Sequence, residues 1–248
     1  ANIGFVPTMG ALHKGHISLI ESSKKKCKKT IVSIFVNPSQ FNKKADYRKY
    51  PRNLNNDLKI LKKLKVDYVL VPKIKDIYQT KKQMKIKLKK KDKILCSKYR
   101  PGHFEGVLGV ISIFLKNIRA KFMFLGDKDF QQVYLIKKYL QKNCNAKIIS
   151  CKTIRNKNRL PLSSRNILLT KNNLSKSEKI SKLLFSFRNR ISNNFNNIKL
   201  LKLYRSKIND LCNKIEYFEI RNINNLSKII SIKNFKIFIA YKQNKVRL

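Results

Sequence analysis

The chain has 248 residues, which is enough for one large domain or two modest ones whose core needs no disulfide support. Its five cysteines are scattered and lack Cys-x-x-Cys spacing, which argues against a disulfide framework and a zinc site. The sequence also has no apolar run of roughly 20 residues and no signal-peptide layout. These features together predict a soluble cytoplasmic protein. The formal net charge of +45 at pH 7 suggests a nucleic-acid partner, but the lysines are spread among Asn and Ile along the whole chain, as A+T-biased coding produces, so we expect a solvated basic surface instead.

The first part of the chain alternates strand-like and helical patterns. A short apolar run at 3–6 is followed by a helical pattern with Leu19 and Ile20 on its apolar side and lysines on the other. The nearly continuous apolar run at 30–36 is typical of a strand buried on both faces of a parallel sheet. Further strands are predicted at 68–71 and 122–125, and further helices at 54–64, 106–118 and 130–139. This alternation predicts an α/β domain over residues 1–155, with a doubly wound, Rossmann-like parallel sheet.

Beyond residue 155 the pattern changes and glycine is absent. Helical patterns at 175–195 and 200–212 are followed by strand-like runs at 217–220 and 236–241, which predicts a smaller α+β domain over 156–248. The lysine-rich stretch 81–93 alternates apolar and basic residues, so we expect an exposed strand or hairpin there, with disorder as the alternative.

Glycine and histidine, both scarce, fall in a few short loops. All seven glycines lie at or before Gly126, and the histidines are His13, His16 and His103. His13 and His16 stand at a helix start directly after the first strand, where backbone N–H groups and the helix N-terminus favour phosphate. Their imidazoles are expected on one face, where they can bond phosphate oxygens, stabilise a five-coordinate α-phosphorus and, from His16, protonate departing pyrophosphate. The motif alone is weak evidence, since the same pair can simply cap a helix.

Six motifs decide between these interpretations. In chain order they are IGFVPTMGALHKGH, SIFVNPSQF, YPR, RPGHFEGV, LGDKDFQQ and LPLSSRN. Their order and approximate spacing resemble the pantothenate synthetase (pantoate–β-alanine ligase) family of the nucleotidylyl-transferase superfamily, over most of residues 3–170. Glu219-Ile220-Arg221 matches a further element of that family.

The resemblance implies a two-step reaction on (R)-pantoate, ATP and β-alanine. Pantoate attacks the α-phosphorus to give pantoyl adenylate and pyrophosphate, and the β-alanine amine then attacks the acyl carbon to release AMP and pantothenate. It also implies a homodimer, Mg²⁺ as the companion of ATP, and a C-terminal domain that closes over the site.

The family pattern assigns roles to individual residues. The ATP-binding residues are Met9, Gly10, Ala11, Leu12, His13, Lys14, Gly15, His16, Gly126, Asp127, Lys128, Asp129, Ile154, Leu162, Ser163, Ser164 and Arg165. His13, His16, Lys128 and Arg165 are the expected catalytic residues, because Lys and Arg supply fixed cations around a triphosphate.

Neutral amides are expected around the acid substrate. Gln40 and Gln132 match the pantoate-binding glutamines, with Gln40 also facing β-alanine, and Asn37 assists on the same loop. An amide orients the pantoate carboxylate without stabilising its ground state as a cation would. Asp129 is the candidate Mg²⁺ ligand. For the turn Arg100-Pro101-Gly102-His103-Phe104 we expect a structural role.

Three features depart from the family pattern. Asn158-Arg159-Leu160-Pro161 replaces Asp-Gly-Leu-Ala, which is expected to stiffen or shift loop closure, and Asp127 replaces Glu. The family's opening helical segment is also missing, and whether either end is natural stays open. Two alternatives remain: another nucleotidylyl transferase or aminoacyl-tRNA synthetase fragment, and an RNA- or DNA-binding protein with a vestigial pocket, which the absence of aromatic platforms disfavours.

Overall fold

The computed structural model describes residues 2–78, 86–193, 198–228 and 234–248. The chain forms two compact units, one comprising residues 1–154 and 162–164 and the other residues 155–161 and 165–248. None of the helices in the described ranges is long and apolar enough to cross a membrane.

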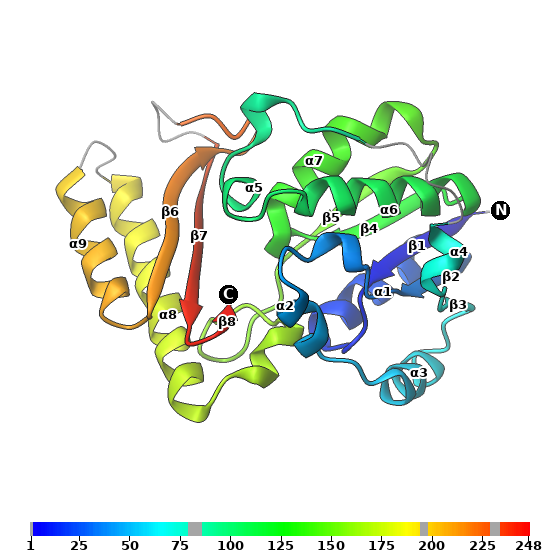
Figure 1. The fold of residues 1–248 in the computed structure, drawn as a ribbon, viewed down its shortest axis with the longest axis horizontal. Coiled ribbons are helices and arrows are strands. Elements are labelled where there is room, and N and C mark those ends of the chain that lie inside the picture. The colour runs from blue at the N-terminus through cyan, green and yellow to red at the C-terminus, as the bar shows by residue number, and fades with distance from the viewer. Residues whose placement is uncertain (1, 79–85, 194–197, 229–233) are drawn as a thin grey trace. The chain divides into compact units, whose positions relative to one another are not determined.

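The first unit is built on a five-stranded parallel sheet with the strand order β3-β2-β1-β4-β5. The strands are β1 (Ile3–Thr8), β2 (Lys29–Ile34), β3 (Tyr68–Leu70), β4 (Phe122–Gly126) and β5 (Lys147–Cys151) (Figure 1). The sheet is wound outward in both directions from β1, so β1 lies between β2 and β4. This confirms the predicted doubly wound α/β fold.

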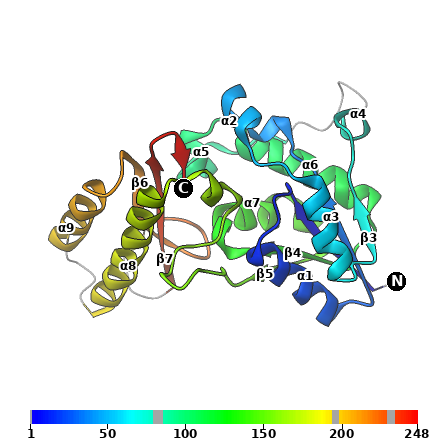
Figure 2. The same cartoon turned by 90° about the horizontal axis from the view of Figure 1, so that it is seen from below.

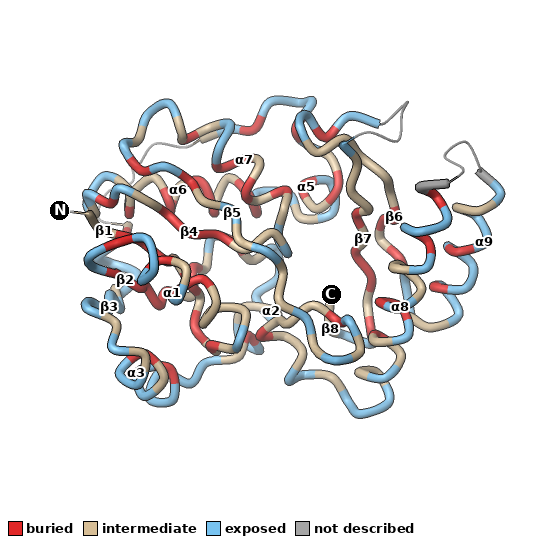
Figure 3. Tube along the Cα trace, turned by 180° about the vertical axis from the view of Figure 1, so that it is seen from behind, coloured by how far each residue is buried: buried red, intermediate tan, exposed pale blue. Residues whose placement is uncertain are grey.

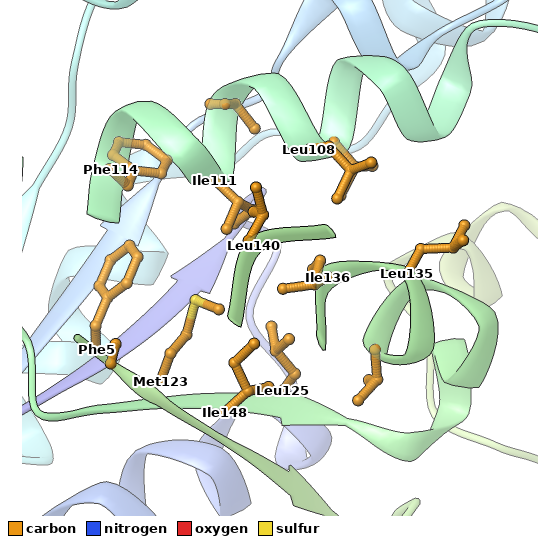
Figure 4. Close-up of a cluster of buried hydrophobic side chains, with 14 of the residues drawn as sticks. Phe5, Leu108, Ile111, Phe114, Met123, Leu125, Leu135, Ile136, Leu140 and Ile148 are labelled. Carbon is orange, nitrogen blue, oxygen red and sulfur yellow. The ribbon is translucent and has the colours of Figure 1, made fainter. Parts of the chain in front are cut away.

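Helices cover both faces of this sheet, and each face has its own apolar core. On one face, α6 (His103–Asn117) and α7 (Phe130–Leu140) pack their buried side chains against Phe5, Met123 and Leu125 of the strands (Figure 4). On the other face, α1 (Lys14–Lys26) and α3 (Leu54–Lys63) pack against Val6, Val32 and Phe124. Phe5 and Val6 of β1 thus serve opposite cores, because successive side chains of a strand point to opposite faces.

Short elements complete this unit. They are η1 (Pro38–Gln40), α2 (Lys44–Lys49), α4 (Ile74–Ile77), η2 (Lys90–Asp92), α5 (Cys96–Tyr99), η3 (Asp127–Asp129) and η4 (Gln141–Asn143). Two differences from the sequence-based expectation concern this unit. The strand β5 was not predicted, although its residues Ile148 and Ile149 pack into the two opposite cores.

The expected strand or hairpin at 81–93 is wrong for the described residues 86–93, while 79–85 lie outside the described ranges. Residues 86–89 have no regular structure, and Leu88 is buried in the core beneath α6 and α7. The buried Asp92 holds the segment in place by accepting hydrogen bonds from Lys138 and Tyr139 of α7, at 2.5 and 2.7 Å. The pattern of apolar and polar residues along the sequence does not reveal such contacts between distant residues.

The second unit packs two long helices against an antiparallel sheet. After η5 (Ser164–Leu168), α8 (Lys171–Asn193) and α9 (Ile198–Asn209) lie side by side (Figures 1 and 2). The sheet has the order β6-β7-β8, formed by β6 (Lys214–Asn222), β7 (Phe235–Gln243) and β8 (Val246–Arg247). Its core gathers Ile180, Phe187, Tyr204 and Phe218, and Figure 3 shows such buried residues (red) recurring along α8 and β7. The α+β character predicted for this part is confirmed.

Candidate active site

Three loops of the first unit follow the carboxyl ends of neighbouring strands. The loop after β1 leads into α1, the loop after β2 contains η1, and the loop after β4 contains η3. Because β2 and β4 flank β1 in a parallel sheet, all three loops lie at one edge of the sheet, where α/β proteins bind ligands. The sequence places His13 and His16 on the first loop, Asn37 and Gln40 on the second, and Lys128 and Asp129 on the third.

His13 and His16 form a reciprocal cap at the start of α1. The backbone N–H of Gly15 donates to Nδ1 of His13 at 3.1 Å, and the backbone N–H of His13 donates to Nδ1 of His16 at 3.3 Å. The ring centroids are 4.1 Å apart. The expectation that both imidazoles share one face is therefore confirmed, and the capping interpretation is correct as well. Since each Nδ1 accepts, each neutral ring carries its proton on Nε2, the nitrogen left for a ligand.

Both histidines are neutral at physiological pH. Burial, and then the nearby charge of Lys128, lowers the pKa of His13 to about 4, against a smaller opposing effect of Asp129. Burial, and then the charge that His13 carries when it is protonated, lowers the pKa of His16 to about 3. The accepted hydrogen bonds at Nδ1 require the same state, because an imidazolium has no acceptor nitrogen. In this state each ring carries its one proton on Nε2, where it can donate a hydrogen bond.

Gly15 makes room for the His13 ring. A Cβ at this position would lie 2.8 Å from Cε1 and 2.9 Å from Nδ1 of His13. The space beside the Gly15 backbone is therefore filled by the ring of the first histidine. The glycine between the histidines is thus part of the cap itself.

The remaining residues of this loop differ in exposure. Lys14 is exposed, Met9 is half-buried, and the Leu12 side chain is buried in the core with α1 and α3. The backbone N–H groups of Ala11 and Leu12 donate to the carboxylate of Asp57, each at 2.8 Å. Asp57 was missed in the sequence. The sequence feature that could have identified Asp57 is its position four residues before Leu61, which puts an acidic side chain on the buried face of an amphipathic helix.

The loop after β4 brings charge next to the histidines. The Lys128 ammonium pairs with the Asp129 carboxylate at 3.2 Å, and both residues are exposed. Asp127 accepts a hydrogen bond from the Ser150 hydroxyl of β5. Gly126 is the last residue of β4.

A magnesium site made by protein ligands alone is not formed in the described ranges, where no group of three or more His, Cys, Asp or Glu side chains could hold a metal ion. Asp129 offers one exposed carboxylate beside the histidine loop. One carboxylate suits a Mg²⁺ ion whose other ligands are phosphate oxygens and water. The residues therefore fit a metal that arrives with a nucleotide.

The loop after β2 is fixed from two sides. Asn37 is fully buried; its Oδ1 accepts from the Tyr78 hydroxyl at 2.6 Å, and its Nδ2 donates to the carbonyl of Gly106 at 3.2 Å. A Cβ on Gly106 would lie 2.4 Å from the Ser39 carbonyl oxygen, so α6 approaches η1 only because this residue is glycine. Asn37 is thus committed to the protein itself.

The backbone of Gln40 is held by the arginine–histidine turn. Nδ1 of His103 lies 2.7 Å from the carbonyl oxygen of Gln40, and Arg100 donates to the same oxygen at 3.1 Å. The structural role expected for the His103 turn is confirmed. Among the described residues, the side-chain amide of Gln40 has no hydrogen-bond partner, although the residue is buried.

Two adjacent glutamines at the start of α7 differ in role. Gln131 is buried and clamps the segment before α5, donating to Ile94 at 2.7 Å and accepting from the Cys96 N–H at 3.0 Å. Gln132 is half-buried, and its side chain has no hydrogen-bond partner within the described ranges. The sequence-based choice of Gln132 as the ligand-binding member thus matches the one whose amide is available.

The segment 154–164 forms a narrow hairpin. The N–H of Leu162 donates to the Ile154 carbonyl at 3.0 Å, and the N–H of Asn156 donates to the Leu160 carbonyl at 2.9 Å. Between these bonds, Pro161 pairs with Arg155 at a position that needs no N–H, so the proline interrupts no ladder bond. Arg159, which replaces the family's glycine, has a left-handed φ of 69°.

The serine–arginine loop follows this hairpin. The buried Ser164 donates its hydroxyl to the Ala11 carbonyl at 3.1 Å and lies 3.4 Å from that of Gly10, so it contacts the histidine loop directly. Ser163 is half-buried in the first unit. Arg165 is half-buried and belongs to the second unit.

Comparisons with known proteins agree with this arrangement. A family model described as pantoate-beta-alanine ligase matches residues 1–248. The pantothenate synthetase of Francisella tularensis subsp. novicida (strain U112) is 43% identical over 252 residues, covering 99% of this chain and 87% of the relative. The solved pantothenate synthetase of Thermus thermophilus has a TM-score of 0.93 at 25% identity, covering 100% of this chain and 91% of that one. The Francisella tularensis pantoate-beta-alanine ligase, complexed with beta-gamma ATP and beta-alanine, has a TM-score of 0.86 at 41% identity, with coverages of 100% and 87%. This chain therefore belongs to the pantoate-β-alanine ligase family.

Proposed function

We propose that this protein works in the cytoplasm as a pantoate–β-alanine ligase, joining (R)-pantoate to β-alanine with ATP by way of pantoyl adenylate. The observation that carries the proposal is the reciprocal histidine cap, which leaves two neutral Nε2–H donors at the edge of the sheet beside Lys128. Membership of the family supports the choice of substrates.

In the first step, a carboxylate oxygen of pantoate attacks the α-phosphorus and the bond to pyrophosphate breaks. Negative charge grows on the phosphate oxygens as this happens. Nε2–H donors that are already oriented stabilise that charge without reorganising, and Lys128 adds a point charge. We assign Arg165 of the serine–arginine loop to the same triphosphate. Asp129 would hold the Mg²⁺ that accompanies the nucleotide, and the metal would supply further positive charge there. The backbone around Ile154 and Leu162 is assigned to the adenine side.

The acid substrate is held by neutral groups. The amides of Gln40 and Gln132 follow the strands on either side of β1, and neither side chain has a hydrogen-bond partner among the described residues. We assign both to pantoate, and Gln40 also to β-alanine. In the second step the amine attacks the acyl carbon, AMP leaves with the bonding electron pair, and the amine releases a proton.

Exchange of labelled pyrophosphate into ATP tests the first step in isolation. With ATP and pantoate but no β-alanine, the protein should exchange label; adding β-alanine should divert the adenylate to pantothenate and AMP. Omitting pantoate is the control, because exchange must depend on the acid. No exchange with pantoate, combined with salt-sensitive binding of RNA, would instead favour the nucleic-acid alternative.

We also propose a homodimer that uses the β3 edge of the sheet. Exposed apolar side chains follow one another along this stretch of chain: Tyr68, Val69, Leu70, Val71 and Ile74. Figure 3 shows β3 as exposed (pale blue). An open apolar edge strand is a surface that proteins normally cover, and a second copy of the chain suits it.

Analytical ultracentrifugation tests this proposal. The protein should sediment as a dimer, and Val69→Lys should shift it to monomer by placing a charge in the interface. Leu203→Lys is the control, because Leu203 is likewise an exposed apolar residue, in α9 of the other unit. A monomeric protein, or dissociation by both variants alike, would contradict the β3 interface.

A further inference from the structure

A buried carboxylate lies beneath the histidine loop. Asp57, in the first turn of α3, is 1% exposed. Its Oδ2 accepts the N–H of Ala11 and its Oδ1 the N–H of Leu12, both at 2.8 Å. No ion pair to Asp57 occurs among the described residues, so the two amides and the positive end of α3 are what stabilise its charge.

The loop is shaped to receive this carboxylate. Gly10 and Ala11 have positive φ values of 76° and 50°. A Cβ on Gly10 would lie 2.9 Å from Asp57 Oδ2, so the carboxylate packs where a side chain would otherwise stand. Two consecutive amides that converge on one anion resemble the backbone nests that bind phosphate in other proteins. Here the nest is filled by the protein's own acid.

The filled nest changes the role of the loop. The amides of Ala11 and Leu12 are spent on Asp57, so phosphate recognition falls to the imidazoles that follow directly in sequence. The same short backbone is fixed from its other polar side, where the Ser164 hydroxyl donates to the Ala11 carbonyl. Because Asp57 binds the N–H groups of this backbone and Ser164 binds one of its carbonyls, the backbone leading into His13 has few alternative conformations.

We infer that Asp57 is a positioning residue, which presets the histidine loop before ATP binds and thereby aims the Nε2–H groups of His13 and His16. The inference rests on the proposed function, since it assigns those imidazoles to the nucleotide. If the amides of Ala11 and Leu12 were free, the histidine loop would become ordered only when they bound phosphate. Because Asp57 accepts both amides, the loop is already ordered before ATP binds.

Hydrogen exchange followed by NMR on the ATP-free protein tests the preset loop without any activity. In the wild type the amides of Ala11 and Leu12 should be protected, and Asp57→Asn should speed their exchange at least about 10-fold, because an amide side chain offers a single acceptor oxygen. Unprotected amides in the folded wild type would overturn the inference, and that measurement needs no variant to fold.

Kinetics of pantoate-dependent pyrophosphate exchange test the consequence. Asp57→Asn should lower the turnover about 10- to 100-fold and raise the KM for ATP, while the KM for pantoate stays within about 2-fold. Asp67→Asn is the matched control. Asp67 accepts the Thr30 N–H at 2.8 Å at the amino end of β2, so this variant weakens a similar side-chain-to-backbone hydrogen bond far from the histidine loop. Its exchange kinetics should match the wild type.

The outcomes separate the two proposals. Wild-type protein that exchanges, together with an Asp57→Asn variant of unchanged turnover and ATP KM, overturns the role of Asp57 and leaves the ligase function standing. Wild-type protein that does not exchange, but shows protected Ala11 and Leu12 amides that Asp57→Asn releases, overturns the ligase function and leaves the clamp on the loop standing.

Discussion

His13 and His16 fix one another's protonation, because the backbone N–H of His13 donates to Nδ1 of His16 while His13 uses its own Nδ1 to cap Gly15. Neither ring can take a second proton without losing a cap. The pair is consequently a set of neutral Nε2–H donors at the start of α1. This arrangement explains why a motif can cap a helix and bind phosphate at once.

The first prediction concerns pH. The pKa values of about 4 for His13 and about 3 for His16 lie below the ordinary value of 6.5. Below pH 6.5 the unfolded chain binds protons that the folded protein does not, so the free energy of unfolding should fall as pH drops from 6.5 toward 3. Above pH 6.5 these two residues contribute the full stabilisation. Urea denaturation at a series of pH values measures this slope.

His16→Gln is the matched variant for the pH series. Glutamine at the third helical position can accept the His13 N–H through its side-chain oxygen, as in ordinary capping boxes, but it does not titrate. The variant should stay folded, lose part of the slope between pH 6.5 and 3, and lose pyrophosphate exchange by at least about 100-fold because the Nε2–H donor is gone. A variant with wild-type exchange would remove His16 from the chemistry.

The second prediction concerns Gly15. Gly15→Ala should displace the His13 ring, because the new Cβ would lie 2.8 Å from Cε1 of His13. We expect pyrophosphate exchange to fall by about 10- to 100-fold. Gly109→Ala is the control in α6, where a Cβ meets nothing within 4 Å. That variant should gain about 0.5–1 kcal/mol of stability from helix propensity and keep its activity.

The third prediction separates the neighbouring glutamines. Gln132→Ala should raise the KM for pantoate at least about 10-fold, leaving ATP binding and stability nearly unchanged, because its amide bonds to nothing in the described structure. Gln131→Ala should instead cost about 1–3 kcal/mol of stability, since the Ile94 carbonyl and the Cys96 N–H lose their partner, while the KM for pantoate is kept. Equal weakening of both substrates by Gln132→Ala would contradict the pantoate assignment.

The fourth prediction concerns Arg159, whose φ of 69° is strained for a residue with a Cβ. Its guanidinium lies 4.5 Å from the Phe185 ring centroid, a contact that Gly and Ala variants lose equally. Arg159→Gly should therefore be more stable than Arg159→Ala by about 1 kcal/mol in thermal unfolding. At Lys157, which is not among the positive-φ residues, the order should reverse. The same order at both positions would exclude backbone strain at Arg159.

The sequence alone determined the alternation of strands and helices in the first unit. Apolar runs such as that of β2, and the face of α1 that carries Leu19 and Ile20, depend on local periodicity, which is written in neighbouring residues. The ordered motifs also fixed the family and directed attention to the histidine loop, Gln40 and Gln132. The burial of residues 86–93 could not be predicted in this way, because the partners of Asp92 lie 46 and 47 positions away.

Only the tertiary structure decided what the histidine loop does with its own polar groups. Asp57 is 46 positions from Ala11 in the sequence, yet it takes the amides that a sequence-based account would leave for phosphate. The same holds for the tautomers of His13 and His16, which depend on which nitrogen faces a backbone N–H. Sequence patterns report which face of an element is buried, whereas hydrogen-bond pairing depends on atoms brought within about 3 Å by folding.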